Sequence, residues 1–243
     1  MQPLLIALQF LTRLPVRLPG MSSNEAIGRS LLCYPLVGLL IGAVLWLAAW
    51  LLGGTSPLLL AALLMAIWVG LTGALHLDGL ADTVDAWIGG YGDRERTLAI
   101  MKDPRSGPMA VVVLVLLLLL KFAALVVLLE SGASSALWLA PLLGRSALLG
   151  LFLTTRYVRE GGLGTALAEY LPRRQGWWVL GGVALVCLLA GSMGLLALVA
   201  ALAIFALLRR RLLRRLGGTT GDTAGALLEI IELAVLLALA LSL

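Results

Sequence analysis

Charged residues and cysteines are scarce in this chain of 243 residues, and both scarcities exclude whole classes of protein. Only 13% of the residues are charged and 61% are hydrophobic. In soluble domains about 25% of the residues are charged and about 45–50% are apolar. Too little polar sequence remains to cover a globule in water, which excludes a soluble monomer, a disordered chain and a coiled coil. The two cysteines, Cys33 and Cys187, lie far apart in apolar runs, which excludes a disulfide framework and a cysteine-ligated metal site.

The excess of positive charge does not indicate nucleic-acid binding in this chain. The net charge is +5 at pH 7, but the basic residues stand in short clusters between apolar runs, a pattern that orients membrane proteins. No nucleic-acid partner is expected. The apolar stretch Pro3–Leu11 is followed, rather than preceded, by Arg13 and Arg17, which is not the order of a cleavable signal peptide. Residues 1–30 are therefore predicted to form an interfacial or re-entrant segment.

Long apolar runs divide the chain into membrane spans of about 20 residues each. The stretches that qualify as single spans are Leu31–Leu52, Pro57–His76, Pro108–Glu130, Ser134–Thr154 and Thr223–Leu243. Trp177–Leu208 is too long for one span, and Gly191–Gly194 interrupts it, which predicts two short helices with a tight connection. The sequence thus predicts an all-α, polytopic integral membrane bundle of about seven transmembrane helices. Residues 1–243 would form a single domain in a lipid bilayer.

The basic residues occur only in alternate connections between these spans. No Lys or Arg occurs in the turns Gly53–Ser56, Ser131–Ala133 and Gly191–Met193. The other connections hold Arg13, Arg17 and Arg29; Arg94, Arg96, Lys102 and Arg105; Arg156, Arg159, Arg173 and Arg174; and Arg209, Arg210, Arg211, Arg214 and Arg215. Because connections rich in Lys and Arg stay in the cytoplasm, we predict a cytoplasmic N-terminus and an outside C-terminus.

Three aspartates follow the second predicted span. If this run is helical, Asp78, Asp82 and Asp85 are offset by four and three residues and share an arc of about 60° on one face. Like charges in this arrangement repel one another, and a divalent cation removes the repulsion while using the carboxylates as hard oxygen ligands. The spacing therefore predicts an Mg²⁺ site, with Mn²⁺ as the alternative metal. The simpler interpretation is a solvated acidic helix face at the membrane boundary.

The same cytoplasmic connection, residues 77–107, continues into a turn of mixed charge. Asp103 stands between Lys102 and Arg105, and Arg94 precedes them. Phosphoryl transfer requires carboxylates with a metal and nearby cations, because metal ions neutralise phosphate oxygens and guanidinium groups bind them bidentately. The pattern therefore predicts phosphoryl-transfer chemistry. Taken alone, the cations would equally serve as orientation signals.

A second cytoplasmic connection, residues 209–222, is basic and ends in a glycine-rich stretch. This stretch, Gly217–Gly221, leads through Asp222 into the last span, and backbone of this kind at a helix N-terminus can receive a phosphate. The chain contains no P-loop pattern. Glu229 and Glu232 lie inside the last span, where buried carboxylates need a cation. They could form either a metal or substrate site or a structural pair, and the sequence leaves both interpretations open.

Two cations and one histidine remain in apolar surroundings. Lys121 and Arg145 lie inside predicted spans, where a charge costs about 2.5–3.5 kcal/mol on insertion scales. We therefore expect both side chains to face inward and to have partners. His76 has two interpretations, as a ligand of metal or phosphate and as an interfacial hydrogen-bonding residue.

Segments along the whole chain, taken in order, match the pattern of a known family. They are Phe10–Pro15, Pro35–Gly42, His76–Asp85, Ile100–Gly107 and Gly217–Ala226. Together they resemble the cobalamin synthase (adenosylcobinamide-GDP ribazoletransferase) family, and the aspartate run followed by the Lys-Asp-Pro-Arg turn is the most specific part. The chain departs from the family at Ala86, where Gly is usual, and at Pro108 and Met109, where small polar residues are usual.

The resemblance implies a Mg²⁺-dependent enzyme of the bacterial inner membrane with its active site on the cytoplasmic side. Such an enzyme joins α-ribazole or α-ribazole 5′-phosphate to adenosylcobinamide-GDP and releases GMP, late in the assembly of the cobalamin nucleotide loop. Asp78, Asp82 and Asp85 would hold the metal. The catalytic residues would be Asp82, Asp85 and Asp103, and either of the last two would accept the hydroxyl proton. Substrate contacts would come from His76, Arg94, Lys102, Arg105, Lys121, Arg145, Asp222 and Glu229. A homo-oligomer is left open.

Two rival functions share parts of this pattern. A membrane alcohol phosphotransferase of the phospholipid type would use the same carboxylates and metal on other substrates. A secondary transporter would line a path with charged residues such as Lys121, Arg145 and Glu229. Transport predicts charges at mid-membrane, whereas the acidic cluster is predicted at the cytoplasmic edge, which favours an enzyme.

Overall fold

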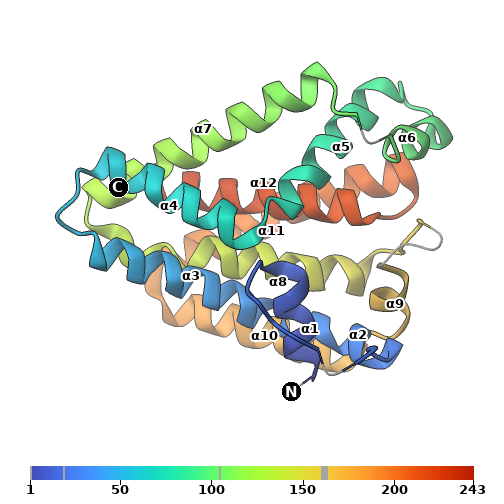
Figure 1. Ribbon diagram of the computed structural model, residues 1–243, viewed down its shortest axis with the longest axis horizontal. Coiled ribbons are helices and arrows are strands. Elements are labelled where there is room, and N and C mark those ends of the chain that lie inside the picture. The colour runs from blue at the N-terminus through green and yellow to red at the C-terminus, as the bar shows by residue number, and fades with distance from the viewer. Residues whose placement is uncertain (1, 19, 104, 160–163) are drawn as a thin grey trace.

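The chain folds into a bundle of helices, most of which run along the length of the molecule (Figure 1). The computed structural model describes residues 2–18, 20–103, 105–159 and 164–243. The α-helices are α1 (Gln2–Leu11), α2 (Asn24–Ser30), α3 (Tyr34–Leu51), α4 (Pro57–Thr72), α5 (Leu75–Gly89), α6 (Arg94–Ile100), α7 (Pro108–Glu130), α8 (Leu139–Thr154), α9 (Gly164–Glu169), α10 (Arg173–Leu189), α11 (Gly191–Leu216) and α12 (Gly221–Ala240). Two short 3₁₀ helices, η1 (Leu31–Cys33) and η2 (Ala133–Ala136), precede α3 and α8.

The predicted all-α membrane architecture is confirmed. Segments long and apolar enough to cross a membrane are Asn24–Leu51, Pro108–Glu130, Ala133–Thr154, Gly191–Leu216 and Gly221–Ala240. These five become six if α4 and α5 count as one broken span. The predicted pair of helices over Trp177–Leu208 is present as α10 and α11, but α10 has only 17 residues, fewer than the about 20 that cross a bilayer. The described residues thus supply five or six candidate spans where the sequence predicts about seven.

The second predicted span, Pro57–His76, ends four residues early. Gly73 and Ala74 both adopt left-handed backbone conformations, with φ of 64° and 58°, and these end α4 at Thr72. The chain then turns by 87° into α5, so His76 belongs to α5 and not to α4. The backbone N–H of Arg13 donates to the Leu71 carbonyl at 2.7 Å, which satisfies a carbonyl near the end of α4.

Helix α8 lies at the centre of the bundle, packed against α3, α10, α11 and α12. Nearly all of its side chains are buried, including Arg145. The outer helices differ, because α7 exposes apolar side chains such as Val112, Leu116 and Leu119. Exposed apolar faces on helices of this length are typical of contact with lipid.

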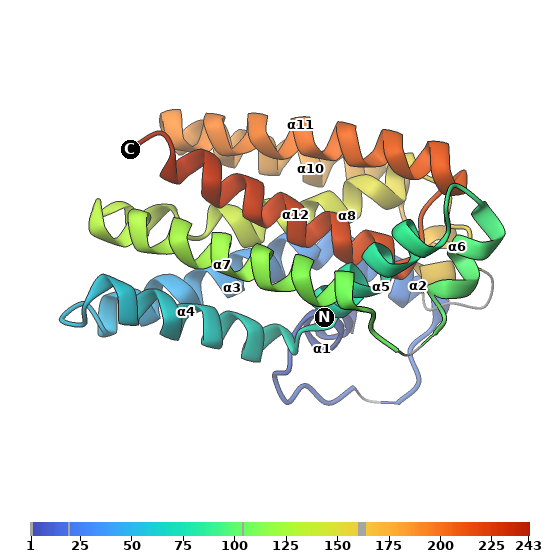
Figure 2. The same ribbon diagram turned by 90° about the horizontal axis from the view of Figure 1, so that it is seen from above.

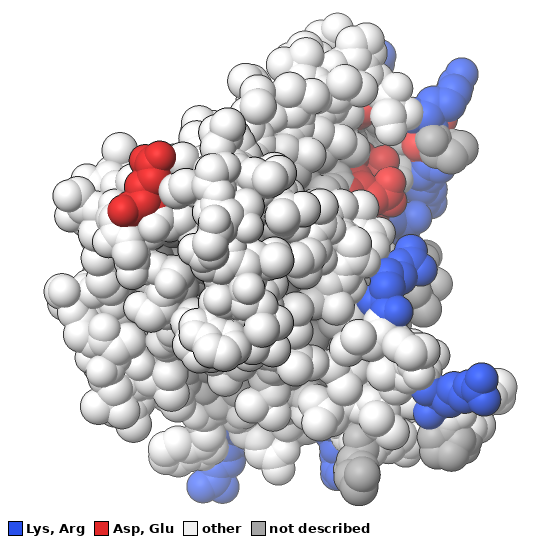
Figure 3. Space-filling view, turned by 60° about the vertical axis from the view of Figure 1, so that its left-hand side comes forward, with Lys and Arg blue, Asp and Glu red and all other residues white. Residues whose placement is uncertain are grey.

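The two ends of the bundle differ in charge. The turns after α3, α7 and α10, which lack Lys and Arg, lie at the end that also holds the C-terminus (Figure 2). Helix α6, the start of α7 and the basic connection from α11 to α12 lie at the opposite end. In Figure 3 the Lys and Arg side chains gather along the right and lower edges of the molecule, and the broad face toward the viewer shows acidic side chains but no basic ones. This segregation agrees with the alternating pattern of the connections, and which end faces the cytoplasm stays a prediction.

Candidate active site

The predicted acidic face lies on α5, where it meets the N-terminal part of α12. Helix α5 extends over Leu75–Gly89, as the aspartate spacing requires. Two glycines allow α5 and α12 to approach closely, since a Cβ on Gly79 would lie 2.9 Å from the Asp222 carbonyl oxygen and one on Gly225 would lie 3.3 Å from the His76 Cα. Gly79 in α5 and Gly225 in α12 therefore bring Asp222 to the acidic face of α5.

Backbone pairing holds the glycine-rich connection before α12. Tyr157 and Thr219 form an isolated parallel bridge, in which the Val158 N–H donates to the Thr219 carbonyl at 2.9 Å. Gly218 has no room for a side chain, because a Cβ there would lie 2.3 Å from the Arg156 carbonyl oxygen. The connection is thus tied to the segment that follows α8.

The hydroxyl of Thr220 begins α12 by accepting a hydrogen bond from the Thr223 N–H at 3.2 Å. In return, the Thr223 hydroxyl accepts one from the Thr220 N–H at 2.8 Å. This reciprocal capping satisfies two backbone donors and sets the start of the helix. It places Asp222 in the first turn of α12, at a fixed position beside α5.

Arg159 pairs with Asp222 and completes a charged rim with the α5 aspartates. Its guanidinium Nη1 lies 2.8 Å from Asp222 Oδ2, and both side chains are partly exposed. Asp82 is half-buried, and the charges that act on it most strongly are those of Asp78, Asp222 and Arg159. We call the four residues Asp78, Asp82, Asp222 and Arg159 the rim. Sequence reasoning named Arg159 only as an orientation signal, because its partner lies 63 residues away.

Asp85 turns away from the rim toward the start of α7. Its carboxylate oxygens accept hydrogen bonds from the Gly107 N–H at 2.5 Å and from the Ala110 N–H at 3.2 Å. A carboxylate at this position satisfies free N–H groups at a helix N-terminus and interacts favourably with the helix dipole. A Cβ on Gly107 would lie 2.8 Å from this carboxylate, which explains the glycine at the end of the turn.

The rim offers the donor chemistry of a shared magnesium site. Within the described ranges, no three His, Cys, Asp or Glu side chains lie close enough to hold a metal by themselves. Magnesium usually takes one or two carboxylates and completes its shell with water and substrate phosphates. Asp78, one helical turn before Asp82 and beside Asp222, fits that role. The assignment of Mg²⁺ itself stays a prediction.

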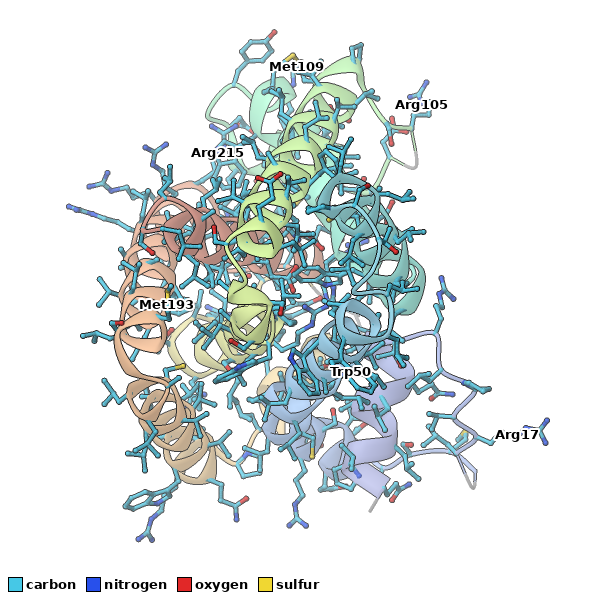
Figure 4. All side chains as sticks on the ribbon, turned by 90° about the vertical axis from the view of Figure 1, so that its left-hand side faces the viewer. Arg17, Trp50, Arg105, Met109, Met193 and Arg215 are labelled. Carbon is cyan, nitrogen blue, oxygen red and sulfur yellow. The ribbon has the colours of Figure 1, made fainter. Side chains whose placement is uncertain are left out.

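The turn between α6 and α7 holds a bidentate ion pair. Arg105 Nε and Nη2 donate to the two carboxylate oxygens of Asp103 at 2.9 and 2.7 Å. These hydrogen bonds lower the pKa of Asp103 to about 2, so it stays ionised and is a weak base at neutral pH. Arg105 projects outward at the edge of the molecule (Figure 4). Pro104, part of the predicted turn, lies outside the described residues.

The other two predicted phosphate-binding cations lie apart from each other. Arg94 Nε donates to the Leu216 carbonyl at 2.8 Å and so binds the C-terminal end of α11. Neighbouring Arg215 donates to Thr97 and to the Trp87 carbonyl, which joins α11 to α5 and α6. Lys102 is exposed and lines a cavity beside the rim.

Lys121 and Arg145 both have the buried partners that we expected. Lys121 Nζ lies 2.6 Å from Glu229 Oε2 and 2.6 Å from Glu232 Oε2. Arg145 pairs with the other oxygen of Glu232, and the Lys121 ammonium stands 4.8 Å from the centre of the Trp68 ring. The network joins α4, α7, α8 and α12. Its members bind one another, and the substrate contacts predicted for Lys121, Arg145 and Glu229 stay predictions.

The cavity beside the rim has a volume of about 560 Å³ and lies between α1, α3, α5, α8, α9 and α12. Its lining is mostly apolar and aromatic, with Arg159 and Lys102 as its charged members. His76 lines the cavity and is only 5% exposed, and its Nδ1 has no hydrogen-bond partner within the described ranges. An apolar cavity with a few placed polar groups is the usual form of a small-molecule site.

Comparison with known proteins places these features in a family. Residues 3–240 match the family described as cobalamin-5-phosphate synthase. A protein named adenosylcobinamide-GDP ribazoletransferase from Stutzerimonas stutzeri (strain A1501) is 67% identical over 241 residues, which cover 99% of this chain and 98% of its own length. Proteins of the same name from Pseudomonas fluorescens (strain Pf0-1) and Pseudomonas putida (strain GB-1) are 66% and 67% identical, over 99% and 100% of this chain and the whole of their own length. No solved structure matches this chain. The chain therefore belongs to the cobalamin-5-phosphate synthase family.

Proposed function

We propose that this protein joins α-ribazole, or its 5′-phosphate, to adenosylcobinamide-GDP in a Mg²⁺-dependent reaction that releases GMP. Identity along the full length to ribazoletransferases supports the activity. The observation that carries the location is the rim, where three carboxylates and one guanidinium meet beside an apolar cavity. We place this site at the cytoplasmic face of the bacterial inner membrane, because the connections that form it are the basic ones.

The reaction is a phosphoryl transfer. A ribose hydroxyl of ribazole attacks the phosphorus bonded to the cobinamide arm, the bond from that phosphorus to the bridging oxygen breaks, and the electron pair leaves with GMP. The hydroxyl proton passes to a carboxylate. Of the predicted bases, Asp85 is bound to backbone N–H groups and Asp103 to Arg105. Asp82 makes no hydrogen bond to the described residues, and we assign the proton to it.

The remaining rim residues bind and orient the diphosphate. Arg159 presents a planar guanidinium that matches phosphate oxygens, and its pairing with Asp222 holds it in place. Asp78, with the diphosphate of the substrate, would hold Mg²⁺, which would neutralise the phosphates and stabilise the leaving oxygen. Lys102 adds a second cation to the lining of the cavity.

The buried charges argue against the rival transporter. A transport path needs charged groups that face a continuous polar channel, whereas Lys121, Arg145, Glu229 and Glu232 are all buried and engage one another. These paired charges form a network without net charge, and its role is to hold helices together. The structure thus offers the transporter no separate support, and the rim fits phosphoryl transfer.

Release of GMP by purified protein in liposomes tests this proposal. The assay supplies Mg²⁺, adenosylcobinamide-GDP and α-ribazole, and it compares the wild type with Asp82→Asn and a control, Glu95→Gln. Loss of a general base costs typically about 10²–10⁴-fold in rate, so we expect at least a hundredfold loss for Asp82→Asn. Glu95 is an exposed carboxylate of α6 without a described hydrogen bond, and its variant should stay active.

Two results would refute the proposal. Wild-type protein that releases no GMP would refute the activity. An Asp82→Asn rate within about threefold of the control would refute the assigned base. A parallel assay with a diacylglycerol acceptor and a CDP-alcohol donor tests the phospholipid-type rival, for which we expect no product.

A further inference from the structure

The cavity beside the rim has the chemistry of a site for a flat aromatic ring. Two stacked aromatic pairs line it. Phe10 and Tyr34 have ring centres 6.3 Å apart at an interplanar angle of 22°, and Phe152 and Tyr157 have ring centres 5.9 Å apart at 18°. They come from α1, α3, α8 and the segment after α8. Aromatic faces bury large apolar areas and favour offset stacking with another ring.

His76 adds one polar group to this apolar lining. Its side chain is almost fully buried, and Nδ1 forms no hydrogen bond with the described residues. A buried polar atom without a partner is costly, which makes it a candidate to meet a ligand. The imidazole can donate or accept at this nitrogen according to its tautomer.

Two of the described residues that line the cavity are charged. Arg159 belongs both to the lining and to the pair with Asp222, and Lys102 also lines the cavity. The first turns of α12 contribute Gly221, Ala224 and Gly225, which leave backbone without bulky side chains along this wall. A ligand that fits has an apolar ring at one end and an anionic or hydroxylated group at the other.

We propose that this cavity holds the heteroaromatic base of the nucleoside acceptor, with His76 bound to a ring nitrogen of that base. This inference rests on the proposed function. The volume of about 560 Å³ suits a base with its ribose, whereas the corrin ring of the other substrate is far larger. The ribose then lies at the charged side, with its hydroxyl next to Asp82 and the incoming diphosphate.

A lipid acyl chain is the alternative occupant of an apolar cavity in a membrane protein. It would stack poorly on the aromatic pairs, and it would leave His76 and Arg159 facing hydrocarbon. The base of a nucleoside satisfies both ends of the cavity, which is why we favour it.

The test pairs one enzyme variant with one substrate analogue. His76→Phe keeps an aromatic ring but removes the nitrogens, and the riboside of dimethylindole replaces the unsubstituted ring nitrogen of ribazole by a C–H group. Wild-type kcat/KM for the acceptor should be about tenfold higher for ribazole than for the indole riboside. In His76→Phe this preference should fall to about one, with the KM for adenosylcobinamide-GDP unchanged. Thr72→Val, a buried control near the bend whose hydroxyl bonds only to its own helix, should keep the wild-type preference.

A purely structural role of His76 predicts equal losses for both acceptors and an unchanged preference, and that result would overturn the inference. If His76→Phe does not fold, direct binding of ribazole without the donor decides the question. Calorimetry should then show binding to wild type and at least a tenfold weaker affinity for Leu148→Trp, which fills the cavity from α8. Equal binding by that variant, or a copurified lipid that ribazole does not displace, would also refute it. A wild type that releases no GMP would refute the proposed function instead.

Discussion

Neutralising Glu232 should destabilise the bundle far more than neutralising an exposed carboxylate such as Glu130. Glu232 is fully buried and accepts hydrogen bonds from both Lys121 and Arg145. The network holds two cations and, with Glu229, two carboxylates, so its net charge is zero. Glu232→Gln leaves two cations with one carboxylate, a net charge of +1 in a buried site.

The expected cost follows from that unpaired charge. Removal of one partner of a buried ion pair typically costs about 3–5 kcal/mol. For a chain of this size, about 1 kcal/mol shifts the midpoint of thermal unfolding by about 2–4 °C, so Glu232→Gln should lower it by roughly 10 °C. Thermal unfolding of the purified protein in detergent measures this shift.

Two further variants separate charge from packing. Lys121→Met combined with Glu232→Gln leaves one cation and one carboxylate, so it should recover part of the lost stability. Glu130→Gln removes an exposed carboxylate at the end of α7 and should change stability by less than about 0.5 kcal/mol. If Glu232→Gln is no less stable than Glu130→Gln, or if the double variant is the least stable, the charge argument is wrong.

The other predictions concern the aspartates and the orientation. Asp82→Asn should remain inactive at any Mg²⁺ concentration while keeping its thermal stability. Asp85→Asn should instead lower the midpoint of thermal unfolding, because it weakens the cap of α7. Equal stability of the two variants would contradict the capping role of Asp85. Arg105 holds the pKa of Asp103 at about 2, so the ion pair should persist down to that pH. Asp103→Asn should therefore leave the acidic side of the pH profile of kcat/KM unchanged above about pH 4. A shift of that side of the profile would restore Asp103 as the base. A C-terminal reporter fusion should respond from outside the cytoplasm, and a cytoplasmic signal would refute the predicted orientation.

Some helix bounds could be predicted closely because local signals determine them. Helix α7 begins at Pro108 and ends at Glu130, as predicted. Proline fits the first turn of a helix, where its missing N–H is not needed, and Gly132 follows its last turn with a φ of 70°. The end of α4 could not be predicted, because an isolated Gly in an apolar run is tolerated within helices. The break at Gly73 and Ala74 depends on the packing of distant segments such as that around Arg13.

The candidate site could be predicted in its residue types but not in its partnerships. The spacing of Asp78, Asp82 and Asp85 correctly indicated that the three aspartates lie on one helix. It could not show that Asp85 turns to N–H groups 22 and 25 residues away. It also could not show that Arg159 pairs with Asp222, because contacts between distant segments leave no periodic signal in one sequence.

Helix α12 carries two groups of charges on one continuous rod, and this makes the spacing between them a functional quantity. Asp222 lies seven residues before Glu229, a separation of about 10 Å along the axis. One residue inserted between them would turn Asp222 by about 100° relative to the buried network, away from Arg159 and from the crossing at Gly79. The buried ion pairs would keep the C-terminal half of α12 in its original orientation. The whole rotation would therefore displace Asp222 and disrupt the rim. Length changes in α12 are therefore predicted to be far less tolerable than substitutions at its partly exposed positions, such as Leu233 and Leu237.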